Sequence, residues 1–314
     1  MKLVFAGTPE VALPSLQALL SSDHEIAAVI TQPPAPSGRG RKVNPSPIEE
    51  FANAHDLVVL APHSISDIDS ELKRIRPDCI PVVAYGQLIP QELLSIPPLG
   101  WVNLHFSLLP SWRGAAPVQH AIWAGDQLTG ATTFILDSGM DTGAVLGSVT
   151  EVIRPTDTAG ELLDRLAHAG ATLLRQSIDA LAVGALQPQP QGSEDISYAP
   201  KITKNDSRIN WLMPAMEIDR RIRATTPAPG AWSTMSGAHS EPERIGFGPV
   251  VPLASELFPA GSIPPGGVVV ESKRILVGTL TLPVVLTTVT PQGRKTMAAS
   301  DWIRGLANPP KAFV

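Results

Sequence analysis

Asn103 and His105 stand two residues apart in an apolar segment that we predict to be a strand over 101–105. Alternate residues of a strand point to the same face, so these two polar side chains share one face while Val102 and Leu104 anchor the other in the core. An amide and an imidazole placed together can donate hydrogen bonds to an oxyanion that develops during a reaction. The alternative interpretation is a hydrogen-bonded pair that closes a strand.

Asp141 is a second candidate, because it lies between Gly139 and Gly143 after another predicted strand over 131–137. A carboxylate on a tight glycine loop can approach a ligand closely. Asp-Thr-Gly is also the triplet of aspartic proteases, but it occurs once, and 314 residues are too many for a half-enzyme that dimerises. The alternative is an aspartate that only forms a turn.

A third candidate is the proline- and glycine-rich stretch 32–42, which carries the positive charges of Arg39, Arg41 and Lys42. We predict a flexible loop whose tip contacts phosphate groups. The alternative is a basic loop that is simply solvated.

Several common sites are missing from the sequence. It has no G-x-G-x-x-G fingerprint, which disfavours a dehydrogenase, no phosphate-binding G-x-x-x-x-G-K-[ST] loop and no H-E-x-x-H zinc helix. Cys79 is the single cysteine, so an internal disulfide and a cysteine-based metal cluster are excluded within one chain. We expect Cys79 to be a buried strand residue and expect no metal.

The elements that must position these candidates alternate in type along the first half of the chain. We predict helices over 13–20, 46–55 and 68–75, between strands over 3–6, 25–30, 58–60, 79–83 and 101–105. This alternation indicates a Rossmann-like α/β domain with a parallel sheet covered by helices. Ligands of such sheets bind beyond the carboxyl ends of the strands, where Asn103 and His105 lie. A later strand is expected over 144–153, and a capping box at Thr158 and Glu161 begins a long helix that Gly184 ends.

The second half has a different pattern. The polar, proline-bearing stretch 187–206 is typical of a linker. After it we predict a helix over 215–223 and short strands over 230–234, 267–271, 274–278 and 280–289. The fold class is therefore an α/β catalytic domain over 1–186, a linker over 187–206 and a smaller, OB-like β-barrel over 207–314.

The charge distribution differs between these parts. The formal net charge is −5, yet residues 206–314 carry 11 Lys and Arg against 8 Asp and Glu. This asymmetry favours a C-terminal domain that meets a polyanion. The sequence shows neither a signal peptide nor the roughly 18-residue apolar run of a membrane span, so we expect a cytoplasmic protein without a membrane partner.

Short segments in order along nearly the whole chain resemble methionyl-tRNA formyltransferases. The resemblance rests on the Asn103-x-His105 pair and on Phe5-Ala6-Gly7-Thr8-Pro9, Thr31-Gln32-Pro33, Gly38-Arg39-Gly40-Arg41-Lys42, Val83-Ala84-Tyr85-Gly86, Ser107-Leu108-Leu109-Pro110, Arg113-Gly114-Ala115-Ala116-Pro117, Gly139-Met140-Asp141-Thr142-Gly143, Ala199-Pro200-Lys201-Ile202, Arg208-Ile209-Asn210-Trp211, Arg221-Ile222-Arg223-Ala224 and Pro229-Gly230-Ala231-Trp232. Two departures are Phe106, where many relatives carry a small residue, and residues 236–262, which are proline-rich and not notably basic.

The resemblance implies an enzyme that transfers the formyl group of 10-formyltetrahydrofolate, its co-substrate, to the amino group of methionyl-initiator tRNA for translation initiation. It implies a catalytic triad of Asn103, His105 and Asp141. It places tRNA on the loop with Arg39, Arg41 and Lys42 and on the C-terminal domain, and favours a monomer. The folate site would be formed by Tyr85, Gly86, Gln87, Ser107, Leu108, Leu109 and Pro110.

Two other functions are compatible with these residues. A formyltransferase acting on a small amine, such as a sugar nucleotide or glycinamide ribonucleotide, would share the triad, but needs neither the basic insert nor the C-terminal domain. A non-catalytic tRNA- or folate-binding protein would not need an intact triad.

Overall fold

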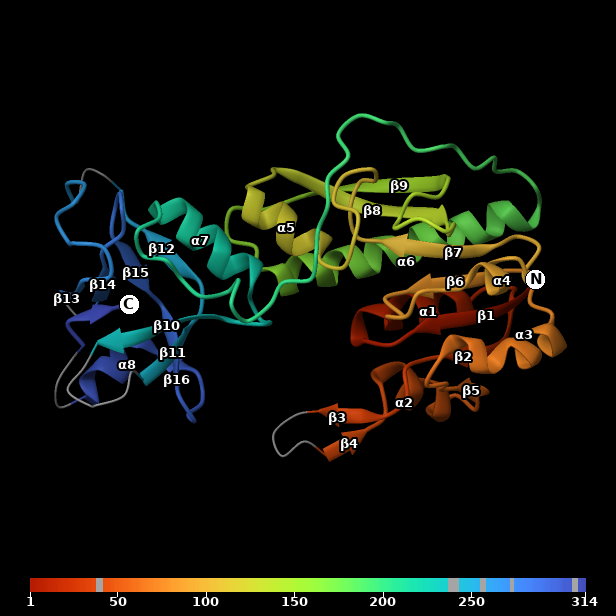
Figure 1. The fold of residues 1–314 in the computed structure, drawn as a ribbon, viewed down its shortest axis with the longest axis horizontal. Coiled ribbons are helices and arrows are strands. Elements are labelled where there is room, and N and C mark those ends of the chain that lie inside the picture. The colour runs from red at the N-terminus through yellow and green to blue at the C-terminus, as the bar shows by residue number, and fades with distance from the viewer. Residues whose placement is uncertain (38–41, 237–242, 255–257, 272–273, 307–309) are drawn as a thin grey trace. The chain divides into compact units, whose positions relative to one another are not determined.

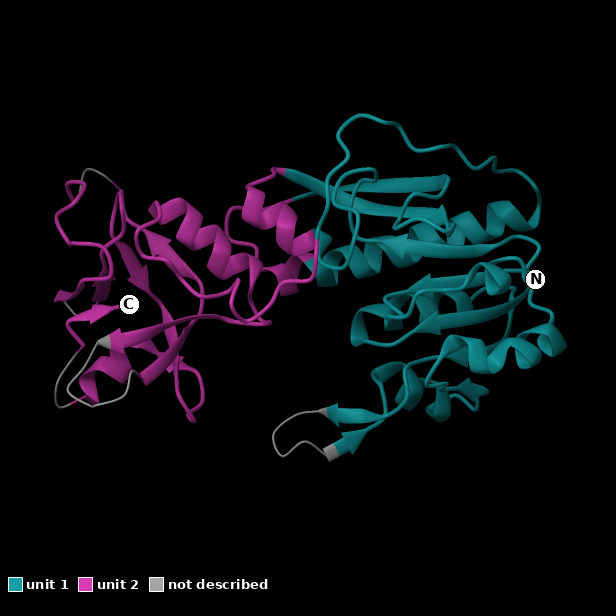
Figure 2. Cartoon of the chain, viewed as in Figure 1, with its two compact units in different colours: residues 1–117, 128–152, 163–199 teal, residues 118–127, 153–162, 200–314 magenta. Residues whose placement is uncertain are grey.

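The computed structural model describes residues 1–37, 42–236, 243–254, 258–271, 274–306 and 310–314. The chain forms two compact units (Figure 2). Unit 1 holds residues 1–117, 128–152 and 163–199, and unit 2 holds residues 118–127, 153–162 and 200–314. The domain boundaries at residues 186 and 206 stay a prediction.

Unit 1 is built on a seven-stranded sheet, in the order β5-β2-β1-β6-β7-β8-β9 (Figure 1). Its strands are β1 (Lys2–Gly7), β2 (Glu25–Ile30), β5 (Val59–Leu60), β6 (Ile80–Val83), β7 (Trp101–His105), β8 (Leu128–Ile135) and β9 (Val145–Val152). The first five in the order pair in parallel, which confirms the predicted Rossmann-like sheet. The last two continue the sheet in antiparallel fashion.

Helices surround this sheet. They are η1 (Glu10–Ala12), α1 (Leu13–Leu20), α2 (Pro47–Ala54), η2 (Ile65–Ile68), α3 (Asp69–Ile75), α4 (Gln91–Leu94) and α6 (Ala159–Ala182), and a small hairpin of β3 (Ala35–Ser37) and β4 (Lys42–Asn44) projects beside α2. Ser46 begins α2 by accepting the Glu49 N–H at 3.0 Å. The predicted capping box is confirmed at α6, where Thr158 and Glu161 exchange hydrogen bonds of 2.8–3.3 Å.

The central strands are buried on both faces, as in other helix-covered parallel sheets. Leu3, Val4, Phe5 and Ala6 of β1 have no exposed surface. Leu104 of β7 packs against α6 so closely that a Cβ on Gly170 would lie 2.9 Å from its side chain. The alternation predicted for β7 therefore places Leu104 in the core and leaves the opposite face to Asn103 and His105.

Unit 2 combines helices with two antiparallel sheets. The helices are α5 (Pro117–Ala124), α7 (Ala215–Ala224) and α8 (Ala299–Arg304). One sheet has the order β17-β16-β11-β10-β18 and the other β12-β15-β14-β13. The strands are β10 (Ala231–Ser236), β11 (Glu243–Phe247), β12 (Val250–Pro252), β13 (Val268–Glu271), β14 (Arg274–Val277), β15 (Val284–Leu286), β16 (Thr288–Pro291), β17 (Met297–Ala298) and β18 (Ala312–Phe313).

The two sheets of unit 2 share one core that includes Trp211, Phe247, Trp302 and Phe313. The chain crosses from one sheet to the other between β11 and β12 and between β15 and β16, and a bridge from Gly267 to Ala312 joins them again. This confirms the predicted antiparallel, barrel-like domain. The single strand expected over 280–289 is instead two strands, because the chain changes sheets at residue 287.

Within the described parts of the chain, no helix combines the length and the apolar character needed to cross a membrane.

Candidate active site

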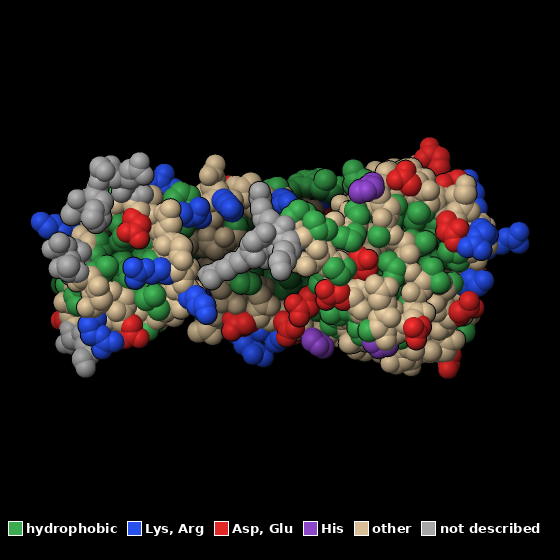
Figure 3. Space-filling model, turned by 90° about the horizontal axis from the view of Figure 1, so that it is seen from below, with side chains coloured by type: hydrophobic (Ala, Val, Ile, Leu, Met, Phe, Trp, Pro, Cys, Tyr) green, Lys and Arg blue, Asp and Glu red, His purple; other side chains and the backbone are tan. Residues whose placement is uncertain are grey.

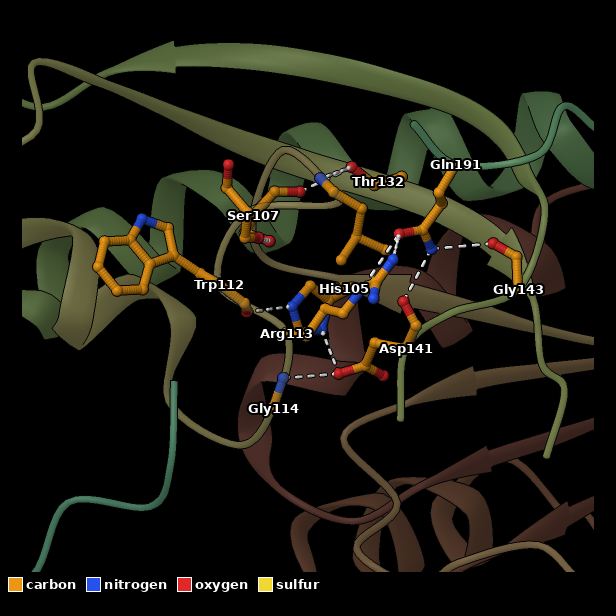
Figure 4. Close-up of polar contacts among 11 residues, drawn as sticks. His105, Ser107, Trp112, Arg113, Gly114, Thr132, Asp141, Gly143 and Gln191 are labelled. Carbon is orange, nitrogen blue, oxygen red and sulfur yellow. Dashed lines mark hydrogen bonds and ion pairs between the residues drawn. The ribbon is translucent and has the colours of Figure 1, made fainter. Parts of the chain in front are cut away.

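His105 ends β7 and is almost enclosed, with 8% of its side chain exposed. Its Nε2 lies 2.9 Å from the carbonyl oxygen of Trp112. A carbonyl oxygen only accepts, so Nε2 carries a hydrogen. The other ring nitrogen, Nδ1, faces Oδ2 of Asp141 at 3.7 Å, and the Asp141 side chain is 16% exposed. In Figure 4 the Trp112 indole points away from His105, so the backbone of this residue, and not its ring, orients the imidazole.

Asn103 lies two residues before His105 on the same face of β7 and is half-buried. The neighbouring strand β8 pairs Phe134 with Asn103 and Thr132 with His105. The edge of the Phe134 ring meets the imidazole, with the ring centroids 6.5 Å apart. The paired strands thus bring the amide and the imidazole to one place at the carboxyl end of β7.

The Asp141 loop follows β8 and has a defined internal structure. Asp137 begins it by accepting hydrogen bonds from the Gly139 N–H at 3.0 Å and the Thr142 hydroxyl at 2.7 Å. Asp141 itself has φ 53°, in the left-handed region that non-glycine residues rarely adopt. Its Oδ2 accepts the Gly114 N–H at 2.7 Å, so the carboxylate is fixed by a backbone donor 27 residues away.

Gly143, the last residue of the loop, has no space for a side chain. A Cβ at this position would lie 1.7 Å from the carbonyl oxygen of Ile135. The glycine is therefore required for the loop to return to the edge of the sheet.

Ser107 to Pro110 form a turn beyond β7. Ser107 is fully buried and donates its hydroxyl to the Ser111 carbonyl at 2.5 Å. The Thr132 hydroxyl donates to the Ser107 carbonyl at 2.7 Å and accepts the Leu109 N–H at 3.2 Å. Ser107 thus shapes the turn from inside. The side chains of Leu108, Leu109 and Pro110 are partly exposed.

Tyr85 to Gln87 lie beyond the neighbouring strand, β6. The Tyr85 ring is buried, its hydroxyl has no hydrogen-bond partner within the described structure, and burial raises its pKa to about 12. Its carbonyl accepts the Thr8 hydroxyl at 2.8 Å and the Gln32 amide at 3.2 Å. Gly86 is exposed with φ 92°, and the Gln87 amide oxygen accepts the Ile65 N–H at 2.7 Å. Gln87 therefore orients the loop.

The basic loop is only partly described. Arg39 and Arg41 lie outside the described residues, and Lys42 begins β4, where its backbone pairs with Ser37. Val43, the next residue of the hairpin, is 65% exposed.

Sequence reasoning missed several residues that complete the site. They are Trp112, Arg113, Gly114, Thr132 and Gln191. Arg113 and Gly114 belong to a segment that carries the resemblance but has no assigned role, and Thr132 is one of three threonines in β8. Trp112 acts through its carbonyl, which every residue type possesses. Gly114 acts through its N–H, and glycine is required there because φ is 122° and a Cβ would lie 2.8 Å from the Ala199 carbonyl oxygen.

An amide, an imidazole and a carboxylate at one edge of a sheet suit transfer of an acyl-type group to a nucleophile, because the first two can stabilise an oxyanion and the third can orient the imidazole. Among the described residues, no group of three or more His, Cys, Asp or Glu side chains could hold a metal ion.

Two family models match the sequence: residues 1–178 match "Formyl transferase" and residues 201–307 match "Formyl transferase, C-terminal domain". The methionyl-tRNA formyltransferase of Thermobifida fusca is 55% identical over 97% of this chain and 96% of its own. That of Acidothermus cellulolyticus is 52% identical over 99% of both chains.

The chain belongs to the methionyl-tRNA formyltransferase family.

Among solved structures, the sugar 3N-formyl transferase WlaRD, crystallised in the presence of dTDP and 5-N-formyl-THF, has a TM-score of 0.65. It is 17% identical, and the likeness covers 94% of this chain and 99% of that one. This likeness shows a shared fold. What sets this chain apart is its high identity to the tRNA enzymes along its whole length.

Proposed function

We infer that this protein transfers the formyl group of 10-formyltetrahydrofolate to the free amino group of methionyl-initiator tRNA. The observation that carries this conclusion is the 52–55% identity to methionyl-tRNA formyltransferases over 97–99% of the chain. The site supports it, because His105 and Asp141 face each other beside Asn103 at the carboxyl edge of the sheet.

The chemistry follows from these three side chains. The amine nitrogen forms a bond to the formyl carbon, and the bond from that carbon to the donor nitrogen breaks. The amine loses one proton and the donor nitrogen takes one up, so the donor leaves as tetrahydrofolate. Asn103 and His105 donate to the oxyanion of the transition state, each contributing roughly 10²- to 10³-fold in rate. Since Nε2 of His105 binds the Trp112 carbonyl, Nδ1 is the nitrogen that donates toward the oxyanion and Asp141.

Asp141 has two roles in this scheme. It orients His105 and stabilises the protonated imidazole, and its carboxylate helps to remove the proton that the amine loses. The attacking amine must be neutral, and an α-amino group has a pKa of about 8. The α-amino group of an ester-linked amino acid is less basic still, so the reaction does not need a strong general base.

The donor site lies between the turns that follow β6 and β7, which are neighbouring parallel strands. The partly exposed side chains of Leu108, Leu109 and Pro110 and the exposed backbone of Gly86 suit a flat ring system with polar edges. Ser107, Tyr85 and Gln87 support these turns through the hydrogen bonds described above and shape the site from behind.

The tRNA contacts are assigned to two basic regions. The first is the loop with Arg39, Arg41 and Lys42. The second lies in unit 2, where Arg208 and Arg244 lie 5.6 and 4.0 Å from the Trp232 ring centroid. Lys and Arg side chains are spread over unit 2 on the face drawn in Figure 3. Guanidinium groups beside an aromatic ring suit a phosphate backbone.

The test is formyl transfer by the purified protein from 10-formyltetrahydrofolate to charged initiator methionyl-tRNA. Uncharged initiator, a charged elongator and an amino-sugar nucleotide are the comparison substrates. Rapid transfer to the charged initiator alone supports the proposal, whereas transfer to the amino-sugar nucleotide alone refutes it. We further propose that the protein is a cytoplasmic monomer. Light scattering of the purified protein in solution tests its oligomeric state.

A further inference from the structure

The loop that carries Asp141 needs support from outside, because its backbone is in an unfavourable conformation. A left-handed φ is less favourable than the usual backbone conformations, even for Asp, and such a residue persists where its surroundings hold it. Asp137 braces the first half of the loop. The second half, from Asp141 to Gly143, is held by a residue from the stretch that the sequence presents as a linker, Gln191.

Gln191 bonds the two ends of this second half at once. Its Nε2 donates to the carbonyl oxygen of Asp141 at 2.7 Å and to that of Gly143 at 2.9 Å. An amide nitrogen has two hydrogens, so both are used on the backbone that carries the catalytic carboxylate. Figure 4 shows the Gln191 side chain between this loop and Arg113.

Arg113 fixes the orientation of that amide. Its guanidinium is buried and donates from Nε at 3.2 Å and Nη2 at 2.6 Å to Oε1 of Gln191. Because a guanidinium only donates, the amide oxygen must face Arg113 and the amide nitrogen must face the loop. The next residue, Gly114, donates its N–H to the Asp141 carboxylate. Arg113, Gly114, Asp141 and Gln191 therefore form a closed ring of contacts, in which Gln191 holds the backbone of Asp141 and Gly114 holds its carboxylate.

The backbone around Gln191 is attached to unit 1 without help from its side chain. Gln189 and Val145 exchange backbone hydrogen bonds at 2.7 and 2.8 Å. Further along, the Arg113 N–H donates to Ser197 at 2.9 Å and the Ala199 N–H donates to Arg113 at 2.7 Å. Loss of the Gln191 side chain should therefore free the Asp141 loop and leave this segment in place.

We propose that Gln191, oriented by Arg113, is a positioning residue that sets the Asp141 carboxylate against His105. This inference rests on the proposed function and extends it. Gln191 acts only through the loop, so its loss should reduce turnover and leave substrate binding unchanged.

Gln191→Glu provides the sharpest test, because it keeps the size and shape of the side chain. A carboxylate can still accept from Arg113, but it presents an acceptor in place of a donor to the two loop carbonyls. We expect kcat to fall about 10- to 100-fold, as for a small misplacement of a catalytic group. KM for both substrates should stay within about twofold. Gln191→Ala should also lower kcat.

The matched control is Gln189→Ala. Gln189 lies in the same segment and is exposed, and the hydrogen bond that its side chain makes at 3.2 Å goes to Gln187 of that segment. This variant should keep wild-type kcat. Loss of kcat by Gln189→Ala equal to that of Gln191→Ala would overturn the proposal, as would wild-type kcat in both Gln191 variants.

A second measurement does not depend on activity. Backbone amides over 137–145 should exchange hydrogen faster in both Gln191 variants than in the wild type, while those over 195–199 should not change. If the amides over 137–145 exchange hydrogen at the same rate in the Gln191 variants and in the wild type, the positioning role is refuted. An inactive wild-type protein would instead refute the proposed function, and the exchange experiment would still decide the role of Gln191.

Discussion

Asp141→Asn removes one negative charge and keeps the shape of the side chain. The carboxylate oxygen lies 3.7 Å from Nδ1 of His105, and the two side chains are 16% and 8% exposed. Two unit charges at this distance interact by about 1 kcal/mol in water and by about 4–5 kcal/mol at an effective dielectric constant of about 20. Because both side chains are largely buried but not fully enclosed, we expect the interaction energy of the pair to lie between these two values.

These energies set the expected loss of activity. Since about 1.4 kcal/mol corresponds to tenfold in rate, Asp141→Asn should lower kcat by about 10- to 10³-fold. The amide oxygen of Asn can still accept the Gly114 N–H, so the fold should be retained and the thermal midpoint should move by only a few degrees. Asp141→Ala should lose similar activity and also about 1 kcal/mol of stability, because the Gly114 N–H loses its acceptor.

The assay is steady-state formylation of charged initiator tRNA, with thermal unfolding of each variant measured in parallel. The matched control is Asp164→Asn, since Asp164 faces His168 at 3.9 Å but both side chains are largely exposed. That variant should keep wild-type activity, and its stability should change by less than about 0.5 kcal/mol. Near-normal turnover by a folded Asp141→Asn protein would refute the assigned role of Asp141.

Three further predictions concern other parts of the molecule. Replacing Arg41 and Lys42 together with Ala should raise KM for tRNA and reduce the salt dependence of binding, and an unchanged salt slope would argue for a solvated loop. Burial raises the pKa of Cys79 to about 12, so the native protein should not react with a thiol reagent at pH 8, and reaction without unfolding would contradict this. Burial also raises the pKa of Tyr85 to about 12, above its value of about 10 in the unfolded chain. The free energy of unfolding should therefore fall as the pH rises from about 10 to 12, because Tyr85 ionises more readily in the unfolded chain. Tyr85→Phe should lessen this fall and should be no less stable than the wild type at pH 7. Its KM for folate should stay within about twofold. A marked rise in KM for folate would instead place the hydroxyl in the donor site.

The local pattern of residues was sufficient to predict much of the N-terminal unit. The strands over 25–30 and 101–105 are where the apolar runs predict them. The alternation along β7 put Asn103 and His105 on one face, and the capping box at Thr158 marked the start of α6. These features depend on neighbours within a few residues, so sequence periodicity and residue chemistry reveal them directly.

The direction of some strands and the division of long apolar runs into strands were harder to predict from the sequence. The short connection between β8 and β9, which contains no helix, already requires antiparallel pairing, whereas the antiparallel pairing of β8 with β7 across α5 appears only in the folded sheet. The apolar run over 280–289 reads as one strand, yet it contributes to two sheets.

Only the tertiary structure decided which distant residues meet around His105 and Asp141. Trp112 holds His105 through a backbone carbonyl, which leaves no mark in the sequence, and the glycine at 114 does not reveal that its N–H binds Asp141. Gln191 lies 50 residues from Asp141 and 78 from Arg113, in a stretch whose composition is typical of a linker. Composition indicates how a segment behaves in isolation. In the folded protein this segment is held in one conformation by hydrogen bonds to distant loops, and these bonds can form only after the sheet has brought the loops to one edge.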